Sequence, residues 1–237
     1  MKLLSKYKSV LIISFLFLSL AAFADELPRI SVTGTAVTLV KPDLIIWNIR
    51  VENEEKELNQ VAEKHTKIVE NILAFLKTKN INKNNIQTSS MKFGVKTKYI
   101  DNTQVKDGYF ASTDISFELR QLDQYNGIWT GLANIDNVEI INISYDTSKR
   151  IDIKNETRIK ALLAAQSKAK ALAEAVDAKI GEPILIEDTS QQWSPSTANN
   201  IQFSRAEVSD RSGNIAVGEL RIEMEVRAEF KLITKLK

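Results

Sequence analysis

Residues 218–233 read GELRIEMEVRAEFKLI, and this stretch decides the fold. Apolar side chains occupy every second position from Leu220 to Leu232, and charged side chains stand between them. A period of two places the two kinds of side chain on opposite faces of a β-strand. One face must be covered while the other can meet water, which is typical of an antiparallel sheet.

The stretch is also long for a strand. At about 3.3–3.4 Å per residue it spans roughly 45–50 Å, whereas strands average about 5–6 residues. We therefore expect it to pair with several partners, to curve strongly or to extend beyond its own subunit.

Further segments with β-branched residues or alternating apolar residues predict the strands that pair with it. They lie at residues 30–40, 43–51, 91–99, 109–119, 138–145 and 184–186. The polar segment 101–108, with Asp107-Gly108 as its local signal, predicts the turn of a long hairpin. On that hairpin Phe93 and Tyr99 have the opposite parity from the neighbouring lysines, so we expect them to face the core. This weakens a reading of the hairpin as a platform for single-stranded nucleic acid.

Three segments change to helical spacing, at residues 54–79, 122–135 and 153–180. The last is rich in alanine, the best helix former, and we expect Gly181 to end it. Its predicted buried stripe consists of Ile159, Leu162, Leu163, Ala169, Leu172 or Ala173, and Val176. The order of elements predicts an α+β fold, in which two long helices and one short helix pack on an antiparallel sheet of long curved strands.

The first 24 residues have the composition of a signal peptide. Three lysines precede the apolar run 10–20, and Ala22-Phe23-Ala24 fits a cleavage site. The apolar run is shorter than the ~20 residues that a membrane span needs, and the alternative is a retained N-terminal anchor. Cleavage would change the formal charge from +2 to −1, so the basic pI gives no argument for nucleic-acid binding. We expect the periplasm as location.

The composition excludes several kinds of chemistry. The chain has no cysteine and one histidine, His65, which excludes a cysteine nucleophile and any multi-histidine metal site. His65 falls on the apolar stripe of a helix, where we expect a hydrogen-bonded core group. The acidic clusters at 52–57 and 187–188 lack the spacing of a calcium loop. We therefore expect no catalytic, cofactor-binding or metal-binding residues, although counting carboxylates leaves a hydrolase pair open.

Residues 189–213 form a long polar stretch that contains Trp193, Ile201 and Phe203. Loops of this length are usually functional or disordered, so we expect a mobile loop. The alternative is a subunit contact anchored by Trp193 and Phe203, since aromatic residues are enriched in interface cores.

The ordered set of motifs resembles the SIMPL-domain family of bacterial periplasmic and outer-membrane-associated proteins. The matching pieces are Ile30-Ser31-Val32-Thr33-Gly34, Pro42-Asp43, Ile86-Gln87-Thr88, Gly108-Tyr109 with Ala111, Ala169-Lys170-Ala171-Leu172-Ala173 with Gly181, and Gly218-Glu219. The resemblance implies one α+β domain over residues 25–237, or two lobes, with no catalytic residues to carry over. It also implies a link to oxidative-stress defence, and ring- or channel-like oligomers in some members.

Two hypotheses follow. The first is a non-enzymatic, oligomeric envelope protein with an indirect role in oxidative-stress defence or envelope integrity. Its partner is a second copy, through strand or loop contacts, and peripheral association with the outer membrane stays open. The second is a periplasmic binding module for a small or lipidic ligand, with an apolar cavity lined by Trp47, Phe93 and Trp129.

Overall fold

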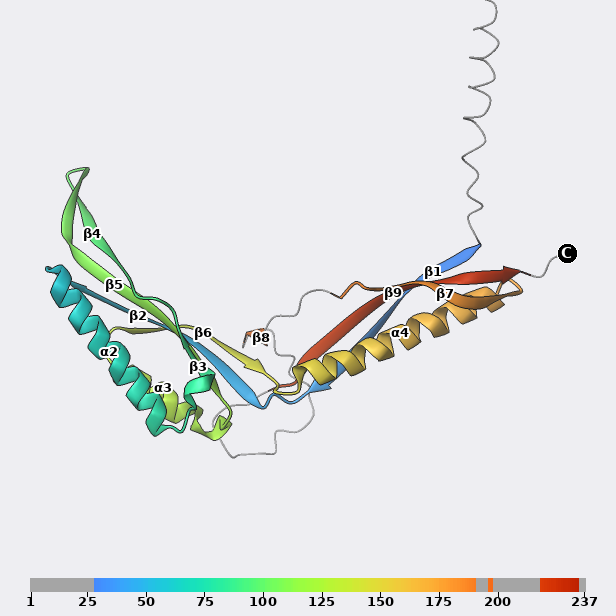
Figure 1. Ribbon diagram of the computed structural model, residues 1–237, viewed down its shortest axis with the longest axis horizontal. Coiled ribbons are helices and arrows are strands. Elements are labelled where there is room, and N and C mark those ends of the chain that lie inside the picture. Colours follow the sequence, from blue (N-terminus) through green and yellow to red (C-terminus); the bar gives the residue numbers. More distant parts are fainter. Residues whose placement is uncertain (1–27, 191–195, 198–217, 235–237) are drawn as a thin grey trace, which may run out of the picture. The chain divides into compact units, whose positions relative to one another are not determined.

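The computed structural model describes residues 28–190, 196–197 and 218–234 (Figure 1). The helices are α2 (Leu58–Thr78), α3 (Tyr125–Ala133) and α4 (Arg150–Glu174), and the short 3-10 turns are η2 (Lys83–Asn85) and η3 (Leu122–Gln124). The strands are β1 (Arg29–Val40), β2 (Leu44–Glu55), β3 (Ile86–Thr88), β4 (Lys92–Ile100), β5 (Thr103–Leu119), β6 (Val138–Asp146), β7 (Ala178–Asp188), β8 (Ser196–Thr197) and β9 (Leu220–Thr234). The predicted α+β class, with two long helices and one short one, is confirmed.

The chain divides into two compact units. Among the described residues, the first unit holds 28–35, 161–189 and 225–234, and the second unit holds the rest. Strands β1 and β9 and helix α4 each contribute residues to both units. No helix in the described ranges is both long and apolar enough to cross a membrane.

The second unit is built on a sheet in the order β3-β5-β2-β6-β8, with β4 added beside β5. The pairings between its strands are antiparallel. Helices α2 and α3 lie against one face, and the core between them includes Trp47, Ile49, Ile72, Ile115 and Phe117. The buried residues of α2 recur with the predicted helical spacing: Val61, His65, Ile68, Ile72 and Leu76. Its start was predicted too early, because β2 continues to Glu55 before the helix begins.

The first unit contains a three-stranded sheet in the order β1-β9-β7, with α4 packed on it. The Leu232 amide donates to the carbonyl of Pro28 over 2.7 Å, and Ser31 donates to Glu229 over 3.4 Å. Residue numbers therefore run in opposite directions along β1 and β9, which makes the pair antiparallel. Strands β7 and β9 are antiparallel as well.

The predicted buried stripe of α4 was right in half of its positions, Leu162, Ala169 and Ala173, and wrong in the others. Its fully buried positions are Thr157 and four alanines about one turn apart, Ala161, Ala165, Ala169 and Ala173, of which only the last two were in the predicted stripe. Ile159 and Leu163 are 60% and 57% exposed instead. The reason is distance: small side chains allow the helix backbone to lie directly on the strand at Gly34, where a β-carbon would come within 2.1 Å of the Ala161 carbonyl oxygen.

The end of α4 also differs from the prediction. The helix stops at Glu174, and Asp177 adopts a left-handed backbone with φ 56°, a conformation that Asp tolerates better than most residues. Gly181, expected to end the helix, lies inside β7, where Lys231 and Ile233 of β9 leave little room for a side chain. Pro183 coincides with an irregularity in the β7–β9 register, as expected for proline in an edge strand.

The terminal strand β9 confirms the alternation. Leu220, Ile222, Met224, Val226, Ala228 and Phe230 are buried. Leu220 belongs to the core of the second unit, whereas Ala228 and Phe230 belong to that of the first. The strand is long because it serves two cores and pairs with both β1 and β7.

The hairpin of β4 and β5 is longer than predicted. Its turn is Asp101-Asn102, where both residues have positive φ (48° and 61°), as a type I′ turn requires. Gly108 instead lies within β5, at a register shift opposite Lys96. It has φ 131°, and a β-carbon there would come within 2.6 Å of the Glu55 carbonyl oxygen.

Candidate functional site

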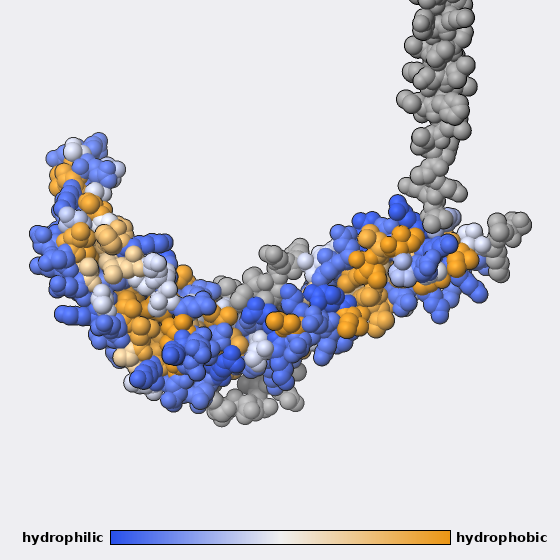
Figure 2. Space-filling model, viewed as in Figure 1, coloured by the Kyte–Doolittle hydropathy of each residue, from blue (hydrophilic) through white to orange (hydrophobic). Residues whose placement is uncertain are grey.

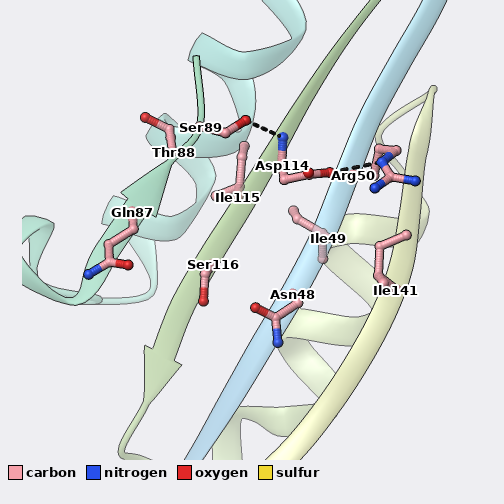
Figure 3. A pocket seen from close by; sticks show the side chains of 10 residues that line it. All are labelled: Asn48, Ile49, Arg50, Gln87, Thr88, Ser89, Asp114, Ile115, Ser116 and Ile141. Carbon is pink, nitrogen blue, oxygen red and sulfur yellow. Dashed lines mark hydrogen bonds and ion pairs between the residues drawn. The ribbon is translucent and has the colours of Figure 1, made fainter. Parts of the chain in front are cut away.

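A row of polar side chains crosses the face of the second unit's sheet that carries no helix. The strand register aligns Gln87 with Ser116, Ser116 with Asn48, and Asn48 with Asn142. Figure 3 shows the first three side chains in line across β3, β5 and β2. Within the described part of the chain, none of these three engages in a hydrogen bond. Their amide and hydroxyl groups are therefore available as donors and acceptors.

An ion pair stands beside this row. The Arg50 guanidinium donates to Asp114 over 2.8 Å, and this hydrogen bond raises the pKa of Arg50. Ser89 fixes the backbone of Asp114 from the other side: its hydroxyl accepts from the Asp114 amide over 3.0 Å, and its amide donates to the Asp114 carbonyl over 2.8 Å. The position of the Asp114 carboxylate is thus set by both neighbours (Figure 3).

The row and the ion pair line a shallow hollow of about 450 Å³. Buried Ile49 and Ile115 form its base, and Ile141, 47% exposed, stands at one side. Asp114 is the one carboxylate among the lining residues, and Arg50 already engages it. The arrangement can hydrogen-bond a small polar molecule, but a pair of carboxylates for acid–base hydrolysis does not line this hollow.

Sequence reasoning did not single out these residues. They sit on the solvent-facing parity of their strands, where polar side chains are ordinary. A signal was available in Asn48 and Ser116, which are uncharged polar residues next to the charged outward residues Arg50 and Glu118. Only the register shows that the uncharged positions coincide.

His65 is the hydrogen-bonded core residue that was expected. Its Nδ1 lies 2.6 Å from Asn53 Oδ1, and its Nε2 lies 2.8 Å from Thr113 Oγ1. Asn53 also donates to the carbonyl of Val61 over 3.2 Å. These partners make Nδ1 the protonated nitrogen of a neutral ring. Burial lowers the pKa of His65, so the ring serves to link α2 to β2 and β5.

Two carboxylates of the acidic cluster at 52–57 are paired with lysines. Glu54 is paired with Lys96, and Glu55 lies 2.7 Å from Lys64. Among the residues that the structure describes, no three His, Asp or Glu side chains are grouped so as to hold a metal ion.

The apolar cavity expected between Trp47, Phe93 and Trp129 is not formed by these residues. Trp47 is fully buried and stacks on Phe117, with 5.8 Å between ring centroids. Trp129 lies 6.2 Å from it and is 47% exposed. Phe93 is 61% exposed. The aromatic rings of Trp47 and its neighbours therefore fill the core and leave Phe93 outside it.

Large apolar side chains are exposed on two elements that contribute to the first unit. On α4 they are Ile151, Ile159, Leu163 and Leu172, with Val176 just after its end, and on β7 they are Ile184, Leu185 and Ile186. Strand β7 is the last strand of its sheet in the described structure. Exposed large apolar side chains and an edge strand are two features of protein interfaces.

Most of the predicted loop 189–213 lies outside the described residues. Trp193, Ile201 and Phe203 lie outside the described residues, as do the 24 residues of the expected signal peptide. Within the predicted loop the structure describes residues 189–190 and strand β8, which pairs with β6 through Ser144 and Tyr145.

The sequence of this chain is similar to a known protein family and to several known proteins. The model of the family described as "SIMPL: Protein of unknown function (DUF541)" matches residues 30–230. The chain is 25% identical over 229 residues to the 26 kDa periplasmic immunogenic protein of Brucella melitensis, covering 90% of this chain and 91% of that one. It is 26% identical over 195 residues to the uncharacterized protein YggE of Escherichia coli K12, covering 81% and 79% respectively.

Proposed function

Because this chain belongs to the SIMPL family, we propose that it is a non-enzymatic envelope protein that is exported to the periplasm and assembles with copies of itself. The name of the Brucella relative, a periplasmic immunogenic protein, supports the location. The pattern of residues 1–24 supports export by a signal peptide. Peripheral association with the outer membrane belongs to the same proposal.

One observation carries the assembly: the first unit leaves large apolar side chains uncovered. Leu163 and Leu172 of α4 are 57% and 52% exposed, Val176 just after the helix is 67% exposed, and Ile184 and Ile186 of β7 are 47% and 53% exposed. Single exposed leucines are ordinary, but several large apolar side chains exposed on consecutive elements support an interaction surface. The burial of alanines beneath α4 makes this stronger, because the helix turns its larger residues outward while its small ones contact the sheet.

Strand edges give the assembly a second route. Strands β1 and β7 are the two edge strands of the three-stranded sheet, and an edge strand can pair with a strand of another copy. The length of β9, first taken as a sign of association, is explained within one chain by its two cores. The argument for assembly therefore rests on the surfaces of α4 and β7.

The role in oxidative-stress defence or envelope integrity is indirect in this proposal. The chain has no cysteine, and beyond residue 24 its methionines are Met91 and Met224. Met224 is 2% exposed, which leaves one accessible sulfur for oxidation. Deleting the gene and measuring survival in peroxide tests the role, and an unchanged survival curve would remove it.

Light scattering on residues 25–237 tests the assembly directly. We expect a mass of several chains at micromolar concentration, and a shift toward the monomer in a Leu163→Ser/Val176→Ser double variant. Leu58→Ser is the matched control, because Leu58 is a similarly exposed leucine (42%) on α2 in the second unit. A monomer at high concentration would contradict the proposal.

The hollow supports a second candidate, a binding module for a small ligand. Its uncharged polar row and its Arg50–Asp114 pair suit a polar molecule better than a lipidic one. Native mass spectrometry of gently purified protein should then show a bound small molecule, and Asn48→Ala/Ser116→Ala should release it. Absence of a ligand, together with no thermal shift across a panel of polar metabolites, would count against this candidate.

A further inference from the structure

The β4–β5 hairpin runs past the rest of its sheet. Strand β2 ends at Glu55, opposite Tyr109, and residues 103–108 of β5 pair with β4 alone. Figure 1 shows this ribbon projecting beyond the start of α2. A two-stranded ribbon with no third strand or helix is marginally stable in water. The hairpin would therefore gain stability from a surface that covers it.

The face of the hairpin that continues the core face is apolar. Alternate residues Phe93, Val95 and Tyr99 of β4 lie on it, and they are 61%, 52% and 74% exposed. Phe93 is paired with Ala111, which is fully buried on the helix-covered face of β5. The predicted parity is thus right but the predicted burial is wrong, because α2 begins too late to cover this end. Figure 2 shows the apolar side chains extending along this hairpin.

Lysines accompany these apolar residues. Lys92, Lys96 and Lys98 alternate with them on β4 and therefore lie on the opposite face of the ribbon, where Lys96 is paired with Glu54 and Lys98 with Asp107. Lys106 is paired with Thr97 on the apolar face, and its Nζ lies 4.0 Å from the centroid of the Tyr109 ring. Residues 91–107 contain four lysines and two aspartates, Asp101 and Asp107. The Lys98 and Lys56 ammonium groups lower the pKa of Asp107 to about 2. The formal net charge of the segment is therefore +2, in a chain whose proposed mature form is −1.

The exposed apolar area of the hairpin indicates whether a protein partner or a lipid bilayer covers it. Phe93, Val95 and Tyr99 together expose roughly 300–400 Å² at the fractions observed. A stable protein–protein interface needs about 800 Å² on each partner, so this patch is too small to hold a second protein alone. Docking on a bilayer surface needs a smaller apolar area. Aromatic rings settle at the headgroup level, and nearby positive charge adds attraction to anionic lipids.

We propose that the β4–β5 hairpin docks on the surface of an anionic phospholipid bilayer, with Phe93 and Tyr99 at the headgroup level. The outer edge of β4 has no strand partner in the described structure, and unpaired backbone groups do not enter hydrocarbon. The insertion is therefore shallow and made by side chains. This inference rests on the proposed export to the envelope, where the protein would meet anionic phospholipid bilayers.

Vesicle co-sedimentation tests the docking. Residues 25–237 are mixed with vesicles of phosphatidylethanolamine and phosphatidylglycerol, and in parallel with phosphatidylcholine alone. The first 24 residues are left out because their apolar run would bind lipid by itself. We expect binding to the anionic vesicles that weakens with salt, and at least a roughly tenfold loss in Phe93→Ser/Tyr99→Ser. Lys92→Gln/Lys106→Gln should lose binding to anionic vesicles as well.

The control is Leu58→Ser/Leu39→Ser, which removes two exposed apolar side chains (42% and 49%) elsewhere in the same unit and should bind as the wild type does. Circular dichroism confirms that each variant is folded. No binding by the wild type, or equal binding by the Phe93/Tyr99 variant, would overturn the proposal. A fall in oligomer mass in that variant, without any vesicle binding, would overturn it in favour of a contact between copies. Because light scattering and vesicle binding are separate readouts, assembly can fail while docking holds, and the reverse.

Discussion

Gly34→Ala is the most direct perturbation of the first unit. Strand β1 lies so close to α4 at Gly34 that an added β-carbon would stand 2.1 Å from the Ala161 carbonyl oxygen and 2.3 Å from the Ala165 nitrogen. Both atoms belong to the helix backbone, so no side chain can rotate away. The strand and the helix must separate instead.

The size of the effect follows from that separation. Ordinary contact begins at 3.4 Å, so the shortfall is roughly 1.3 Å, and a gap of 0.5–1 Å already forfeits about a quarter to a half of a dispersion contact. The loss is shared by the four alanines of α4 that are fully buried. Overpacking typically costs about 1–3 kcal/mol, and the gain of about 0.5–1 kcal/mol from replacing glycine in a strand offsets part of it. We expect a net loss of about 2 kcal/mol.

Urea unfolding followed by circular dichroism measures this loss. At this chain length, 2 kcal/mol corresponds to a fall of roughly 4–8 °C in Tm. The matched control is Gly127→Ala on α3, where the nearest atom to the added β-carbon is the mobile Nζ of Lys79 at 3.4 Å. There we expect stabilisation by about 0.5–1 kcal/mol. The same substitution should thus lower the free energy of unfolding at Gly34 and raise it at Gly127.

Two results would refute the close-packing argument. One is a Gly34→Ala variant within about 0.5 kcal/mol of the wild type. The other is rescue by Ala161→Gly, because the obstructing atom is a backbone oxygen that this second change leaves in place.

Three further predictions concern the second unit. Trp47→Ala should cost about 3–5 kcal/mol, whereas Trp47→Phe should cost less, because the indole N–H has no hydrogen-bond partner among the described residues; urea midpoints that coincide would contradict this. Asn53→Ala should cost about 1–3 kcal/mol by leaving buried His65 without one partner, and an unchanged midpoint would show that the network adds nothing. Burial lowers the pKa of His65 in the folded state, so the unfolded chain takes up the proton first as the pH falls below about 6.5. The free energy of unfolding should decrease from there until the pH passes the folded pKa, and His65→Gln should flatten that slope.

The hairpin shows why part of the fold could not be read in advance. Asp107-Gly108 is a strong local turn signal, yet the turn forms at Asp101-Asn102. Gly108 is needed instead because the carbonyl of Glu55 approaches it to within 2.6 Å of a β-carbon position. That contact joins residues 53 positions apart, so no local pattern contains it.

The hollow was missed for a related reason. Asn48, Gln87 and Ser116 are unremarkable polar residues one strand at a time, and they become a row only when the register aligns β3, β5 and β2. In contrast, His65 was predicted correctly, because a single histidine on an apolar helical stripe needs buried partners wherever the helix packs.

The sequence alone determined the type of each main element and much of the core. The alternation of 218–233 predicted β9 and its buried face, helical spacing predicted α2, and the missing cysteines and lone histidine excluded whole classes of chemistry. Tertiary structure alone decided three things: that alanines rather than leucines face the sheet from α4, that β9 divides its apolar face between two cores, and that Phe93 and Tyr99 stay exposed. Periodicity is a property of neighbouring residues and is written in the chain. How closely two segments approach, and where a covering helix begins, depends on residues far apart in sequence.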